Sequence, residues 1–235
     1  MSQTLDTTPI ALNGWVVFLA AGLLAGAASF PALHHLNDRY RVEPSGSMDP
    51  KVLEKEDRAK NAGEWRSSAL QGGVIGAIFG ALFGLAEGLR HRMPGRGLIG
   101  GLVGAAVGAV IAIPCRNAVR QLALYFISND MHGLHVSAAT QGLLWVGPVL
   151  GAAVALRVAA PTKWEGNGLF LGAIVGGLVA CFAVPIAGQI AFPIDYQDRV
   201  ANHIGQSAMT TVIVGLLVGL GAAFTVRPPE KESFV

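Results

Sequence analysis

Residues 72–86 read GGVIGAIFGALFGLA, a stretch without any ionisable side chain in which Gly72, Gly76, Gly80 and Gly84 recur every four residues. Residues four apart lie on one face of an α-helix, so these glycines form a flat strip that another helix can approach closely. Because lipid provides little hydrophobic force between helices, such close approach supplies the packing energy of membrane bundles. The stretch therefore predicts a membrane-spanning helix that packs through its glycine face.

Three more stretches have the same character, at 98–113, 143–156 and 169–184, and none of them contains Asp, Glu, Lys, Arg or His. The whole chain is 52% hydrophobic and only 14% charged, whereas a soluble domain carries about 25% charged residues. Helices are the expected form because lipid cannot hydrogen-bond to a bare backbone, and about 20 residues cross a hydrocarbon core of about 30 Å. We therefore expect an all-α integral membrane protein with six transmembrane helices.

The expected organisation places one extramembrane module after the first transmembrane helix. Its segments are a polar N-terminal tail 1–13, a helix 14–36, a polar insert 37–66 with a short helix, a helix 67–90, a helix with an amphipathic extension 96–127, helices 137–158, 168–192 and 205–227, and a C-terminal tail 228–235. The tail 1–13 carries Asp6 and no Lys or Arg. A secretory signal begins with basic residues, so we expect the first helix to be retained.

The six helices read as three tandem Gly-rich two-helix repeats, about 70 residues apart. The even helices each end in an arginine followed closely by a proline: Arg90 and Pro94, Arg157 and Pro161, and Arg227 and Pro228. The odd helices each contain a late proline, which we expect to act as a hinge: Pro31, Pro114 and Pro185. Duplication explains this pattern, and low-complexity composition shared by Gly-rich membrane helices is the alternative.

Positive charge gives an expected orientation in a bacterial inner membrane. Cytoplasmic loops are rich in Lys and Arg, and the arginines that close the even helices favour the cytoplasm for both termini. The insert 37–66 does not choose a side, because it holds seven basic and seven acidic residues.

The glycines are expected to pack helix against helix, in the manner of a glycine zipper. The expected packing positions are Gly72, Gly76, Gly80, Gly84, Gly100, Gly104, Gly108, Gly172, Gly176, Gly215 and Gly219. The alternative is a pore lined by glycine with exposed carbonyls.

Polar residues gather just after the odd-helix prolines, at the membrane end that faces the insert. These residues are His34, His35, Arg116, Asn117, Arg120, Gln121 and Gln189. They are candidates for a polar vestibule or, alternatively, for contact with lipid headgroups. Near the opposite end, Glu87 is expected to pair with Arg90 or Arg92 by helical spacing rather than to carry protons.

No metal or cofactor site is expected from the sequence. His132 and His135 have ligand-like spacing, but Gly133 between them indicates a loop and no Cys or Glu completes a known pattern. Cys115 and Cys181 lie in or beside apolar stretches, where thiols behave as small hydrophobic groups.

One short string in the insert, Pro44, Ser45, Gly46, Ser47, Met48 and Pro50, resembles the serine box of type I signal peptidases, which are membrane-anchored Ser/Lys proteases. The resemblance implies Ser47 as a nucleophile. That family also needs a lysine base on a β-rich extramembrane domain, and its other boxes have no counterpart here. Proteolysis is therefore only a remote alternative.

The apolar stretches lack the ionisable groups that ion-coupled transporters and proton relays place near the membrane midplane. The sequence therefore favours a non-catalytic multi-pass protein, a structural or accessory subunit of a membrane assembly. Its expected partners are lipid and other membrane proteins or further copies of itself. A small-solute or ion channel or permease is the alternative. The net charge of +2 gives no reason to expect nucleic acid.

Overall fold

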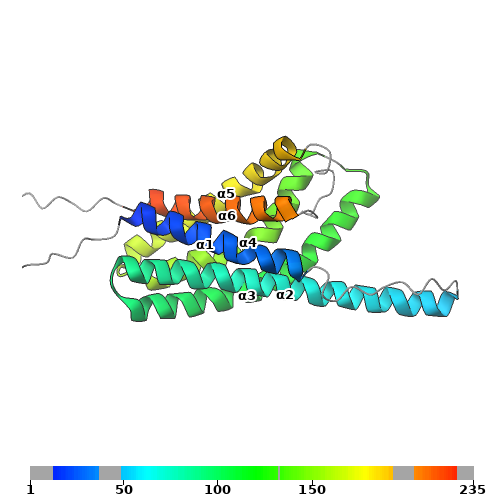
Figure 1. Ribbon diagram of the computed structural model, residues 1–235, viewed down its shortest axis with the longest axis horizontal. Helices are drawn as coiled ribbons and strands as arrows, with labels where there is room; N and C mark the ends of the chain where they lie inside the picture. The colour runs from blue at the N-terminus through cyan, green and yellow to red at the C-terminus, as the bar shows by residue number, and fades with distance from the viewer. Residues whose placement is uncertain (1–12, 37–48, 132, 193–203, 227–235) are drawn as a thin grey trace, which may run out of the picture.

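The computed structural model describes residues 13–36, 49–131, 133–192 and 204–226, and the regular structure within them is entirely helical. The six helices are α1 (Gly14–His35), α2 (Pro50–Arg90), α3 (Pro94–Ser128), α4 (Leu134–Ala159), α5 (Lys163–Ala191) and α6 (Ile204–Phe224). All six are long and apolar enough to cross a membrane. The expected all-α fold with six candidate transmembrane helices is therefore confirmed (Figure 1).

We expected a short helix in the polar insert and a separate transmembrane helix after it. The structure has one continuous helix, α2, in place of the two. Asp49 caps the first turn by accepting a hydrogen bond from the Lys51 N–H (2.9 Å), and α2 then continues for 41 residues. No proline follows Pro50 before Pro94. Gly63, at the transition from polar to apolar sequence, costs a helix only about 1 kcal/mol. A change of hydropathy therefore does not end this helix.

Each helix packs against the next one in the chain, and α6 returns to pack against α1. α3 lies along both α2 and α4, while α6 lies between α1 and α5, and a further contact joins α2 to α4. The beginning of α1 meets the end of α6, where the Trp15 and Phe224 rings are 4.6 Å apart. The last part of α3 is angled away from the axis of α2 (Figure 1), and Pro114 lies within this helix.

Glycines lie where helix backbones come closest. A Cβ atom added to Gly80 of α2 would lie 2.1 Å from the Gly104 carbonyl carbon of α3, and one added to Gly22 of α1 would lie 2.2 Å from the Gly215 oxygen of α6. Every glycine that we expected to pack has a similar contact, below 3.0 Å, with an atom of another helix. Because side chains essentially never approach so closely, these interfaces require glycine.

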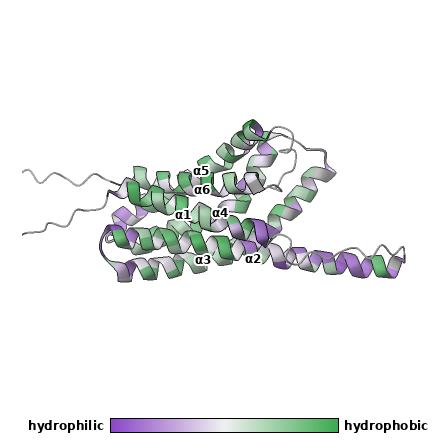
Figure 2. Cartoon of the chain, in the orientation of Figure 1, coloured by the Kyte–Doolittle hydropathy of each residue, from purple (hydrophilic) through white to green (hydrophobic). Residues whose placement is uncertain are grey.

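The middle of the bundle is filled with apolar side chains, among them the fully buried Phe18, Phe79 and Phe83. The Trp145 ring lies 5.9 Å from the Phe79 ring and links α4 to α2. Large apolar side chains also cover the outer faces of α3 and α5, including Leu102. The beginning of α2 is different, since it extends past the other helices and is strongly polar (Figures 1 and 2).

Candidate functional sites at the two ends of the bundle

Buried charge gathers at the end of the bundle where α2 finishes and α5 begins. We call Glu87, Arg90, His91 and Glu165 the charged cluster. Glu87 lies in the last turn of α2 and is fully buried. His91 caps the same helix, and its backbone N–H donates to the Glu87 carbonyl oxygen (3.2 Å). Helical spacing thus places three of the four groups together before any tertiary contact forms.

The fourth group, Glu165, comes from the first turn of α5, 74 residues after His91. Thr162 caps that helix, since its hydroxyl oxygen accepts a hydrogen bond from the Glu165 N–H (3.2 Å). A carboxylate in the first turn is favoured by the positive end of the helix dipole. The cap and the dipole therefore hold Glu165 against the end of α2.

Arg90 is the centre of the ion pairs in the charged cluster. Its Nη1 donates to Glu87 Oε2 (2.9 Å), and its Nη2 donates to Glu165 Oε1. The guanidinium carbon also lies 5.7 Å from the centre of the Phe18 ring of α1. Arg90 thereby ties α1, α2 and α5 together, and the expected pairing of Glu87 with Arg90 is confirmed.

The His91 imidazole is close to both carboxylates. Its Nε2 is hydrogen-bonded to Glu165 Oε1 (3.3 Å) and also lies 3.3 Å from Glu87 Oε1. Burial lowers the pKa of His91 below its usual value, and the neighbouring Arg90 charge lowers it further, while Glu165 acts in the opposite direction. The uncharged imidazole is therefore favoured at neutral pH.

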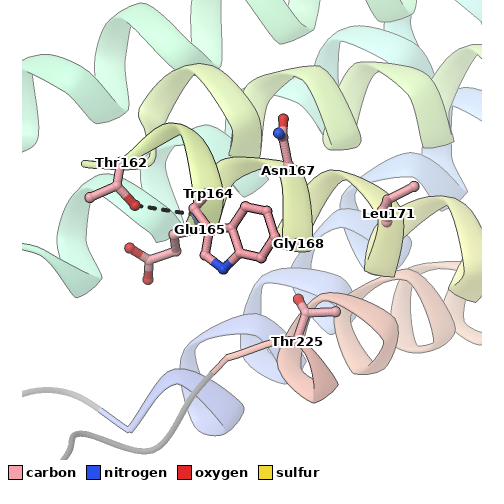
Figure 3. Close-up of a pocket in the computed structure, with 7 residues that line it drawn as sticks. All are labelled: Thr162, Trp164, Glu165, Asn167, Gly168, Leu171 and Thr225. Carbon is pink, nitrogen blue, oxygen red and sulfur yellow. Dashed lines mark hydrogen bonds between the residues drawn. The ribbon is translucent and has the colours of Figure 1, made fainter.

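A pocket of about 500 Å³ adjoins the charged cluster on the outside of α5 and α6. Glu165 and Thr162 lie at one end of it and Leu171 at the other, with the Trp164 ring between them (Figure 3). Trp164 is 76% exposed, as is common for tryptophans at a membrane surface. Glu165 is consequently the member of the cluster that a molecule in this pocket would meet.

A second set of polar groups is buried at the opposite end of the bundle. Arg116 of α3, only 9% exposed, donates to the Gln71 side-chain oxygen of α2. The Gln71 amide in turn donates to the Leu33 carbonyl oxygen of α1 (3.1 Å), and Ser67 donates to the Leu36 carbonyl oxygen. Within the described residues no carboxylate forms an ion pair with Arg116.

Not every buried polar group in the described segments finds a hydrogen bond. The exceptions are Ser29 Oγ, both amide atoms of Gln206 and Glu87 Oε1. Ser29 and Gln206 belong to α1 and α6, at the same end of the bundle as Arg116. Buried polar atoms without partners are rare, so each of these positions is a candidate for a bound water or ligand.

The structure does not gather the predicted vestibule residues into one site. Arg116 is buried, whereas His35, Gln121 and Gln189 are exposed. His34 stacks on the Phe30 ring, with centroids 5.9 Å apart, and Asn117 donates to the Ile113 carbonyl oxygen of its own helix (3.3 Å). The Arg120 side chain lies outside the described part of the structure, as do His132 and the string from Pro44 to Met48.

The sequence alone predicted neither the full charged cluster nor the contact between Gln71 and Arg116. Glu87 and Arg90 were recognisable by helical spacing, and His91, four residues after Glu87, carries the same signal. Glu165 and Gln71 had no such signal because their partners are on other helices.

Searches against family models, curated proteins and solved structures find nothing that matches this chain.

Proposed function

We propose that this protein is a non-catalytic membrane scaffold, an accessory subunit that holds one charged helix outside the membrane for a protein partner. The observation that carries the proposal is the continuity of α2. Its glycines at every fourth position from Gly72 to Gly88 lie in close contact with α3, while the beginning of the same helix reaches past the bundle (Figure 1). Because α2 is held against α3 over its second half, its projecting first part can support a bound protein partner rigidly.

Residues 51–66 of α2, which we call the projecting segment, are mostly exposed. Its charged residues, of which five are basic and four are acidic, are Lys51, Glu54, Lys55, Glu56, Asp57, Arg58, Lys60, Glu64 and Arg66. At about 1.5 Å per residue the segment is roughly 24 Å long. Mixed charge of this kind suits a partner surface that carries both signs, because complementary pairs fix the register of two proteins.

The interior of the bundle also supports a scaffold. The glycine strips of α2, α3, α5 and α6 pack inside this one chain. Phe79, Phe83 and Trp145 fill the described middle of the bundle. A transported ion or polar solute needs polar groups along its path. The two phenylalanines provide none, and the Trp145 N–H is already donated to the Gln141 side-chain oxygen (3.2 Å).

We further propose a bacterial inner membrane with both termini in the cytoplasm. Arg90, Arg92, Arg96 and Arg157 lie at the end of the bundle where α1 starts and α6 finishes, and positive charge favours the cytoplasmic side. The projecting segment is at the other end (Figure 1), so its partner would lie outside the cytoplasm.

The test is to purify the tagged protein from its native membrane in a mild detergent and to identify stoichiometric partners by native mass spectrometry. Ala59→Pro would break the projecting segment, because proline in a helix interior costs about 3 kcal/mol. Ala59→Ser is the matched control at the same exposed position. The partner should be lost from Ala59→Pro alone, with bundle stability unchanged in both. A partner retained by Ala59→Pro, or no stoichiometric partner at all, would refute the proposal.

A permease is the second candidate, and the buried guanidinium of Arg116 favours it. Charged side chains within transmembrane helices are rare and frequently line substrate pathways. Arg116→Ala separates the two functions, with exposed Leu124→Ala on the same helix as the control. Loss of solute or ion flux in liposomes at unchanged protein abundance would establish the permease. Dispersal of a complex without any change in flux would establish the scaffold.

A further inference from the structure

Three potential metal ligands converge in the charged cluster. One oxygen from each of Glu87 and Glu165 and a ring nitrogen of His91 all lie within 4.8 Å of one another. They come from two helix ends that are held by caps: His91 closes α2, and Thr162 opens α5. Such anchoring limits how far the ligands can move apart, which is a requirement of a specific metal site.

The separations suit a tetrahedral metal ion. His91 Nε2 is 3.3 Å from one oxygen of each carboxylate. Two ligands bound at about 2.0–2.1 Å in a tetrahedron lie about 3.3–3.4 Å apart. Small rotations of the Glu165 side chain, which is 25% exposed, would bring the third pair to the same spacing.

The strongest independent sign of a ligand is Glu87 Oε1. The Glu87 side chain is 0% exposed, and this oxygen accepts no hydrogen bond from the described residues. His91 Nε2 is near it, but not in a hydrogen-bonding arrangement. A buried carboxylate oxygen that accepts no hydrogen bond is unfavourable, and Arg90 binds only the other oxygen of Glu87, Oε2. A cation between Glu87 and His91 would give Oε1 a partner.

We propose that Glu87, His91 and Glu165 bind one Zn²⁺ ion or a similar divalent transition-metal ion, with water as the fourth ligand. Imidazole nitrogen suits Zn²⁺, whereas Ca²⁺ and Mg²⁺ prefer a full set of oxygen ligands. The water would face the pocket beside Trp164, because Glu165 is the member of the cluster that lines it. The site stands on its own and does not depend on the scaffold function.

Arg90 has a defined place in this site. It binds Glu87 Oε2, so the other oxygen of that carboxylate, Oε1, is left for the metal ion. Arg90 also donates to Glu165 Oε1, so the metal ion would share that oxygen with Arg90 or bind Glu165 through Oε2. Outer hydrogen bonds of this kind orient carboxylate ligands. The two carboxylates and Arg90 together carry one negative charge, and a divalent cation changes the net charge to one positive. Because the Glu165 side chain is partly exposed, solvent can stabilise this positive charge.

Cobalt provides the direct test, because tetrahedral Co²⁺ has visible absorption that reports its ligands. The full chain, purified in detergent micelles and stripped with a chelator, is titrated with Co²⁺ and then with Zn²⁺. We expect one Co²⁺ per chain with a tetrahedral spectrum, displaced by Zn²⁺. We also expect bound Zn²⁺ to raise the melting temperature until a chelator is added. Absence of stoichiometric binding would overturn the proposal.

Substitutions assign the ligands. His91→Gln and Glu165→Gln should each weaken binding by more than about 100-fold, since changes to outer-shell groups alone cost 10- to 100-fold. Glu165→Gln is the safer variant, because Glu165 is partly exposed and Glu87 is fully buried. His135→Gln, at an exposed histidine of α4, is the control and should bind like the wild type. Loss of binding in His135→Gln, or normal binding in both His91→Gln and Glu165→Gln, would place the metal elsewhere and refute the site.

Discussion

Alanine at Gly80 should separate α2 from α3 and destabilise the whole bundle. The added Cβ would lie 2.1 Å from the Gly104 carbonyl carbon and 2.2 Å from the Ala105 nitrogen. Both are backbone atoms, so no side chain can rotate out of the way. Carbon atoms pack at about 3.5–4.0 Å, and the helices must therefore move apart locally by about 1.5 Å.

Gly73 on the same helix is the matched control. A Cβ there would lie 3.9 Å from the nearest atom, Ile113 Cδ1, which is ordinary contact. Both substitutions gain the same helix propensity, about 1 kcal/mol, so this gain cancels in the comparison. Overpacking costs about 1–3 kcal/mol. Because a rigid backbone meets the new atom, we expect Gly80→Ala to be about 3 kcal/mol less stable than Gly73→Ala.

Reversible unfolding in mixed micelles, followed by tryptophan fluorescence, measures this difference. Trp145 is buried and lies 5.9 Å from the ring of Phe79, the neighbour of Gly80, so its emission reports on this part of the bundle. Far-UV circular dichroism should show the same helix content in both folded variants. Equal stability of Gly80→Ala and Gly73→Ala would refute the close approach of α2 and α3.

Two more pairs of substitutions test the buried polar groups, in the same unfolding assay. Arg90→Ala should cost about 3 kcal/mol, because it leaves the buried Glu87 carboxylate uncompensated. Arg58→Ala removes an ion pair whose arginine side chain is 78% exposed, so it should cost less than about 1 kcal/mol. Equal losses in the two variants would refute the role of Arg90. Ser29→Ala should stabilise by about 1 kcal/mol, since its hydroxyl is buried without a hydrogen bond, whereas Ser67→Ala should lose about 1 kcal/mol. A destabilised Ser29→Ala would mean that its hydroxyl has a partner.

The transmembrane helices were predictable because lipid imposes one rule on all of them. Every backbone group must be satisfied within its own segment, so apolar length alone identifies a helix. The stretch 72–86 shows this clearly, and its glycine period also indicated which face packs. Neither inference needed knowledge of where the other helices lie.

The length of α2 and the composition of the charged cluster were not predictable in the same way. A polar-to-apolar change at Arg66 marks where a helix meets the membrane, but it does not weaken backbone hydrogen bonds, so the helix continues. Glu165 joins Arg90 only because α4 packs against both α5 and α2, which brings the beginning of α5 to the end of α2. Contacts between residues on different helices depend on how the helices are arranged in the bundle. A single sequence does not show which helices lie side by side.

The continuous α2 also connects the projecting segment mechanically to the opposite end of the bundle. Its 41 residues span about 60 Å, with Pro50 at one tip and Arg90 at the other. A tilt of about 5° displaces one tip by about 5 Å relative to the other along such a rod. Such a tilt would have to separate the glycines of α2 from α3. A force at the exposed tip therefore acts on the interface between α2 and α3, since no proline lies within α2 after Pro50 to form a hinge.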